Sequence, residues 1–82
     1  MDDAHEHFTE ALVTAEQMGE PHEAARARVG LGDVAERSGD RETAVDLWQQ
    51  ALPHFRMVDA PEVAGIEQRI ESALGSQASD RR

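Results

Sequence analysis

The sequence contains no cysteine and no long apolar run. Without cysteine the chain cannot be a disulfide-stapled scaffold, and it has no thiolate ligands for a metal ion. No apolar stretch comes near the roughly 20 residues that a membrane-spanning helix needs, so we expect no membrane segment. The N-terminal stretch MDDAHEH is acidic, whereas a secretory signal begins basic and then turns apolar. These absences favour a cytoplasmic protein.

Positive charge is missing from the first 25 residues, which hold seven acidic side chains and no Lys or Arg. The whole chain of 82 residues carries a formal net charge of −9. A nucleic acid or an anionic membrane requires a basic face that neutralises its phosphates, so we expect neither as a direct ligand. The acidic first quarter is either a solvated face of a small protein or a docking surface for a basic partner.

Signatures of catalysis and of cofactor binding are missing too. The sequence has no HExxH motif, P-loop, Gly-x-Ser-x-Gly motif or nucleotide fingerprint. His5 and His7 would point about 200° apart on a helix and could not chelate one ion. His22 and His54 lie too far along the chain to be assigned as further ligands. We therefore expect no enzymatic activity, no cofactor and no metal ion. The alternative of a helical metal or cofactor carrier would rest on these histidines alone.

Apolar residues recur at helical spacing through most of the chain, and strand signals are absent. The sequence thus predicts an all-α fold. Pro53 predicts a kink at 49–53 or an early end of the third helix. The small polar segment 75–82 predicts a flexible tail after a helical array at 1–74. The four predicted helices are residues 3–18, 21–38, 41–58 and 62–74.

Glycines mark the turns and the close approaches. Gly19 and Gly39 suit the left-handed position that ends a helix, and Asp40 suits the N-cap of the next one. Such short links force antiparallel helical hairpins. Gly30 and Gly32 each cost about 1 kcal/mol of helix propensity relative to Ala. Their place inside the second helix is reasonable only if a bulky neighbour must fit there.

The chain repeats itself at an offset of 40 residues. With a one-residue deletion after Pro61, the repeat continues into the last helix. Two hairpins related by translation are typical of a solenoid, in which each unit buries its face on the next. The matched pairs are Ala4 with Ala44, Phe8 with Trp48, Ala11 with Ala51, Leu12 with Leu52, Pro21 with Pro61, Glu23 with Glu62, Ala25 with Ala64, and Leu31 with Ile70.

This pattern resembles the tetratricopeptide repeat, in a long form of about 40 residues instead of 34 that is similar to helical arrays of bacterial regulators. The resemblance implies one full unit flanked by two half units. It also implies that Gly32 and Ala51 lie where helices cross and that Trp48 fills the space beside them, in the core and not as an exposed hot spot. The residues that carry the resemblance are Leu31, Gly32, Gly39, Asp40, Ala44, Trp48, Ala51 and Leu52.

The resemblance further implies a non-catalytic module that binds a protein or peptide on its concave face. Chaperone-binding members grip a terminal carboxylate with Lys and Asn, but Val29 and Asp33 stand at those positions here. A basic or mixed segment is therefore the expected ligand. The residues predicted on the concave face are Arg26, Val29, Asp33, Glu36 and Arg37.

Self-association is the second expectation, because an array with open ends can be closed by a second copy. The apolar flanks predicted to form such a homodimer are Phe8 and Leu12 at one end and Ile66 and Ile70 at the other. An alternative is a closed four-helix bundle, an adaptor in which the first and fourth helices pack together. Its acidic first helix would then bind a basic partner.

Overall fold

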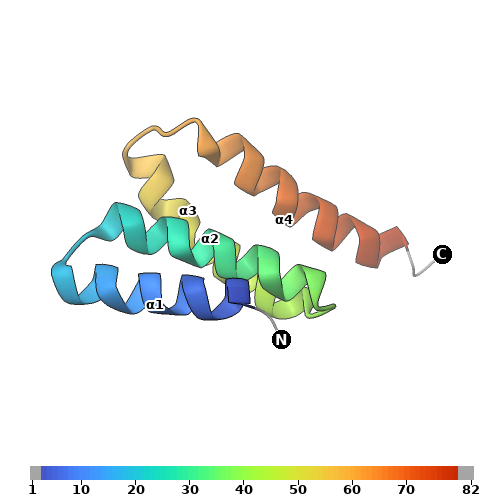
Figure 1. Cartoon of the computed structure of the whole chain (residues 1–82). Coiled ribbons are helices and arrows are strands. Elements are labelled where there is room, and N and C mark those ends of the chain that lie inside the picture. The colour runs from blue at the N-terminus through green and yellow to red at the C-terminus, as the bar shows by residue number, and fades with distance from the viewer. Residues whose placement is uncertain (1–2, 80–82) are drawn as a thin grey trace.

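A computed structural model of the chain, which describes residues 3–79, consists of helices joined by short turns (Figure 1). The all-α class is therefore confirmed, with four helices and no strand among the described residues. The predicted bounds of the first three helices are correct to within one residue. The helices are α1 (Asp3–Met18), α2 (Pro21–Arg37), α3 (Arg41–Met57) and α4 (Glu62–Ser79).

One expectation about a helix end was wrong. Helix α4 continues to Ser79, so the predicted tail is helical as far as that residue, and residues 80–82 lie outside the described part. Gly75 does not adopt a positive φ, and one helical glycine costs only about 1 kcal/mol, too little to end a helix by itself. Of the two alternatives at Pro53, the early end does not occur, because α3 runs on to Met57 with Pro53 inside it.

The three turns share one geometry, the Schellman motif. In each, one residue with a positive φ follows the helix, and the next N–H donates to the carbonyl five residues earlier. The left-handed residues are Gly19 (φ 68°), Gly39 (φ 88°) and Asp59 (φ 54°). The closing bonds run from Glu20 to Ala15 (2.8 Å), from Asp40 to Ala35 (2.9 Å) and from Ala60 to Phe55 (2.9 Å).

Only one of these turns is followed by a side-chain cap among the caps that the structure describes. Asp40 accepts hydrogen bonds from the Thr43 backbone N–H (3.2 Å) and from the Thr43 hydroxyl (2.7 Å). The hydrogen bond from the Thr43 hydroxyl lowers the pKa of the Asp40 carboxyl below its ordinary value of 3.8, and the bond from the Thr43 N–H lowers it further, by a smaller amount. The predicted N-cap of α3 is thereby confirmed, whereas Glu20 before α2 makes no such bond.

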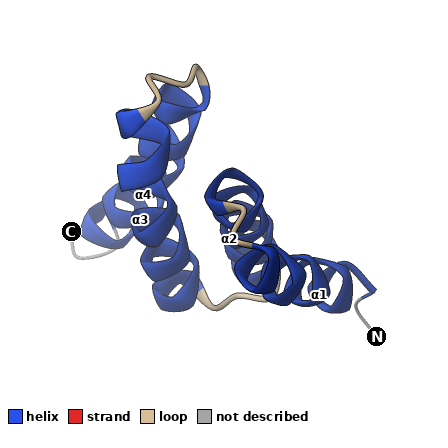
Figure 2. Cartoon of the chain, turned by 90° about the vertical axis from the view of Figure 1, so that its left-hand side faces the viewer, coloured by secondary structure: helices blue, strands red, loops and turns tan. Residues whose placement is uncertain are grey.

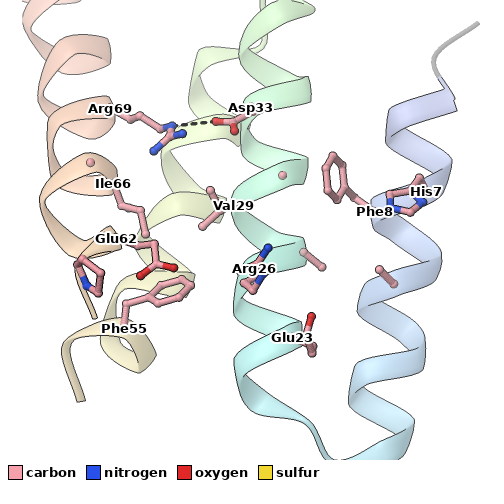
Figure 3. Close-up of a pocket in the computed structure, with 15 residues that line it drawn as sticks. His7, Phe8, Glu23, Arg26, Val29, Asp33, Phe55, Glu62, Ile66 and Arg69 are labelled. Atoms are coloured by element: carbon pink, nitrogen blue, oxygen red, sulfur yellow. Dashed lines mark ion pairs between the residues drawn. The ribbon is translucent and has the colours of Figure 1, made fainter. Parts of the chain in front are cut away.

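Each helix packs mainly on the helix before it and the helix after it, and the α2–α3 contact is the most extensive. Figure 2 shows α1 and α2 on one side of the molecule and α3 and α4 on the other. The Cα radius of gyration is 13.2 Å, against about 12 Å for a compact domain of this length. The first and fourth helices do not form the closed bundle of the alternative expectation, because α2 lies between them (Figure 3).

The core is centred on α3. Trp48 is fully buried, and Phe55 and Ile66 are 1% exposed. A Cβ on Gly32 would lie closer than 3.0 Å to the Trp48 indole, and one on Gly30 closer than 3.0 Å to the Phe8 ring. The expected role of both glycines is thus confirmed. The other predicted repeat positions are buried at Ala44, Ala51 and Leu52 and partly buried at Leu31.

Candidate functional site

A groove of about 560 Å³ lies over α2, with α1 on one side and α4 on the other (Figure 3). Helix α2 supplies its centre, from Glu23 to Asp33. Phe8 lines it from α1, and Ile66 and Arg69 line it from α4, while Phe55 of α3 lies at its base. Phe55 and Ile66 are buried, so the groove has an apolar base between charged edges.

The groove contains part of the predicted concave face. Arg26, Val29 and Asp33 line it, because positions three and four apart share one face of α2. Glu36 and Arg37 are exposed but are not among the lining residues. They lie beyond Asp33, the residue at which an ion pair with Arg69 joins α2 to α4.

Asp33 of α2 contacts side chains of both α3 and α4. Its Oδ1 accepts a hydrogen bond from the Trp48 indole N–H at 3.2 Å. The same oxygen lies 3.1 Å from Arg69 Nε in an ion pair that joins α2 to α4 (Figure 3). The buried indole N–H therefore has its acceptor, as buried polar groups require. We expected Asp33 to meet a ligand, but its carboxylate is already engaged by two donors of the chain itself.

Three charged groups of the groove have no such partner. Glu23, Arg26 and Glu62 are exposed, and they form no ion pair or side-chain hydrogen bond with the residues that the structure describes. They lie away from the Asp33–Arg69 pair, with Arg26 and Glu62 near the half-buried Val29 and Glu23 farther along α2 (Figure 3). The groove thus presents an apolar surface next to two carboxylates and one guanidinium.

The apolar flanks predicted for self-association are only partly available. Ile66 is 1% and Ile70 9% exposed, so the expectation of an open flank at these two residues was wrong. Helix α4 turns Ile66, Ile70 and Ala73 into the core cluster that α3 forms with it, and α3 covers these three side chains. Phe8 and Leu12 are partly buried. The large apolar side chains that are exposed are Val13, Met18, Met57, Val58 and Leu74.

Two histidines that sequence reasoning kept apart are neighbours in the structure. His22 Nδ1 and His54 Nε2 lie 3.1 Å from each other. Each is 16 residues from Ser38, on opposite sides of the turn that joins α2 to α3. This equal spacing was the signal that could have paired them, because residues equidistant from a tight turn face each other in an antiparallel hairpin.

No family model matches the chain, and comparisons with curated proteins and with solved structures found no significant match. Within residues 3–79 no helix is long and apolar enough to cross a membrane. Among the same residues no group of three or more His, Asp or Glu side chains is arranged to hold a metal ion. The features of the described residues that bear on function are the groove, the exposed faces and the histidine pair.

Proposed function

We propose that the chain is a non-catalytic, cytoplasmic protein-binding module that takes up a segment of another protein in the groove over α2. The observation that carries this proposal is the groove itself, in which an apolar base lies beside three charged groups without partners in the described chain. Helices that pack mainly on their sequence neighbours are typical of repeat arrays, whose extended faces bind partners. The proposed relationship is to the tetratricopeptide repeat, with one unit and two half units.

The chemistry of the groove favours a basic ligand segment. Glu23 and Glu62 outnumber Arg26, and the chain as a whole has a net charge of −9. An apolar side chain of the ligand would cover Val29, and a neighbouring Lys or Arg would meet Glu62. Charge complementarity of this kind raises the rate of encounter and sets the orientation of the bound segment. A terminal carboxylate is disfavoured, because no Lys or Asn stands at positions 29 and 33.

The test is a selection of short random peptides on the immobilised chain, followed by affinity measurements on the enriched peptides. Two exposed residues of the groove are changed in opposite directions. Glu62→Lys should weaken binding and Arg26→Glu should strengthen it, each by roughly five- to tenfold for an exposed charge. Both side chains are exposed, so neither change should disturb folding.

Glu42→Lys is the matched control, because it makes the same charge change on an exposed residue of α3 outside the groove. It should have less effect than Glu62→Lys. Enriched peptides without Lys or Arg would contradict the proposal. So would equal losses of affinity in Glu42→Lys and Glu62→Lys, because binding would then depend on net charge alone.

Self-association through α1 is a second candidate function. Helix α1 has one extensive neighbour, α2, and Ala15 is the one residue that it buries within the described chain. Val13 is 47% and Met18 66% exposed on it, so a second copy could cover this helix. Light scattering across a wide concentration range should then show a mass of twice 9.0 kDa, which Val13→Glu reduces. A monomer at every concentration would remove this candidate and leave the groove as the binding surface.

A further inference from the structure

The histidine pair lies outside the groove over α2, beside a hollow that adjoins the groove at Glu23. We propose that His22 and His54 together chelate a divalent transition-metal ion such as Zn²⁺, Ni²⁺ or Cu²⁺. His22 is in the first turn of α2 and His54 in the last turn of α3. These turns lie at the same end of the molecule, opposite the Gly39 turn (Figure 1). The ion would thus link the start of α2 to the end of α3, at the end of the α2–α3 hairpin that lies away from its turn.

The distance between the two nitrogens fits a chelate. His22 Nδ1 and His54 Nε2 are 3.1 Å apart. Zinc–nitrogen bonds are about 2.0–2.1 Å long, so two imidazole ligands at tetrahedral or right angles are separated by roughly 2.9–3.4 Å. In the free protein, one of these nitrogens must carry a proton to make the observed hydrogen bond. For chelation, the histidine that donates this hydrogen bond must take its other tautomer, with the proton on its other ring nitrogen, so that both nitrogens offer a lone pair to the ion.

Phe55 gives the two rings a fixed support. Its ring is 5.6 Å from that of His22 and 5.5 Å from that of His54, with both histidines at a steep angle to it. Phe55 is 1% exposed, so this support is part of the core. The two imidazoles are therefore held near each other before any ion arrives, which lowers the entropic cost of chelation.

The surroundings of the pair favour the binding of a cation, and the imidazole ligands favour a transition metal. The hollow beside the pair is also lined by Glu10, Glu20 and Glu23, whose charges attract a cation. Among the described residues no third ligand joins the pair, so water would complete the coordination. Imidazole nitrogen selects Zn²⁺, Ni²⁺ and Cu²⁺ over Mg²⁺ and Ca²⁺, which require oxygen ligands.

The test uses the full chain, titrated with zinc chloride by calorimetry and melted with and without the ion. The wild type should bind one Zn²⁺ per chain, and its melting temperature should rise, because an ion that binds the folded state stabilises it. Mg²⁺ should do neither. In His22→Asn and in His54→Asn the affinity should fall at least about tenfold, because one of two linked ligands is lost, and the rise in melting temperature should disappear.

His5→Asn is the matched control, since His5 is exposed on α1 and, unlike His7, does not line the hollow beside the pair. It should bind as the wild type does. His22 is exposed, so His22→Asn gives a decisive result even if the partly buried His54 proves necessary for folding. Loss of Zn²⁺ binding in the variant of α1 but not in His22→Asn would overturn the proposal. It would also be overturned if millimolar Zn²⁺ gave the wild type neither a heat of binding nor a rise in melting temperature.

Discussion

The two hairpins of the molecule, α1–α2 and α3–α4, follow one plan with different side chains. Glu16 of α1 pairs with Arg28 of α2 at 2.9 Å, and Arg56 of α3 pairs with Glu67 of α4 at 2.8 Å. In the repeat alignment Glu16 corresponds to Arg56, and Arg28 to Glu67. The same bridge therefore occurs in both hairpins with its charges exchanged. The repeat thus preserves the position of the ion pair, but not which of the two helices carries the acidic residue.

The aromatic residues show how the hairpins differ. Phe8 of α1 lies on Gly30 of its own hairpin, whereas the equivalent Trp48 of α3 lies on Gly32 of the other hairpin. Arg69 occupies the place in α4 that corresponds to Gly30, and it reaches Asp33. The first aromatic closes a hairpin, and the second joins two hairpins. One repeated position can thus pack either on the helix that follows it or on the helix that precedes it.

The largest effect should separate the two aromatic residues. Trp48→Ala should cost about 3–5 kcal/mol, because it empties a fully buried site, and this approaches the whole stability of a small domain. Phe8→Ala should cost only about 1 kcal/mol, because Phe8 is half-buried on an outer helix. Urea unfolding followed by circular dichroism measures both. Equal losses would show that α1 is as strongly held as α3.

The two glycines of α2 should also behave differently. Gly32→Ala should destabilise the chain by about 1–2 kcal/mol, because a Cβ would strike the buried Trp48, and the gain in helix propensity offsets only part of this. Gly30→Ala should be close to neutral, since the half-buried Phe8 ring can turn aside. The urea midpoints of both variants test this, and a Gly30→Ala variant as unstable as Gly32→Ala would refute it.

The turns provide a prediction about acid stability. The pKa of Asp40 is lowered in the folded chain by its bonds to Thr43, so its stabilising effect is fully present above its ordinary value. It is lost as the pH falls through the lowered value. Asp40→Asn should therefore make the melting temperature depend less on pH below about 4. Glu20→Gln removes a charge at the equivalent turn without a cap bond and should change this dependence less.

The ion pairs should give the smallest effect. Both pairs are at least partly exposed, so each should contribute roughly 0.2–1 kcal/mol, measured by a double-mutant cycle in low salt. Exchanging the charges, with Glu16→Arg and Arg28→Glu together, should restore most of what Glu16→Arg alone loses. Failure of this rescue would mean that the charge order within each hairpin matters, contrary to the equivalence described above.

The backbone plan was predictable from local signals, whereas most side-chain partners were not. Gly19, Gly39 and Asp40 act within one turn of the chain, so their roles follow from neighbouring residues alone. Two features depend instead on how helices approach across the fold: the engagement of Asp33 by Trp48 and Arg69, and the burial of Ile66 and Ile70. The meeting of His22 and His54 was predictable from their equal distance to the turn at Ser38. Periodicity predicts which face of a helix is apolar, but not which neighbour covers it.

The preference of each helix for its sequence neighbours also governs how the chain reaches its structure. Contacts between residues close in sequence require little loop closure before they form, and helical proteins of this kind fold on the order of microseconds to milliseconds. The α2–α3 contact is the most extensive and its turn carries the Asp40 cap, so this hairpin is the natural nucleus. We expect helices α1 and α4 to pack on opposite sides of it afterwards, since each contacts mainly one helix of this hairpin.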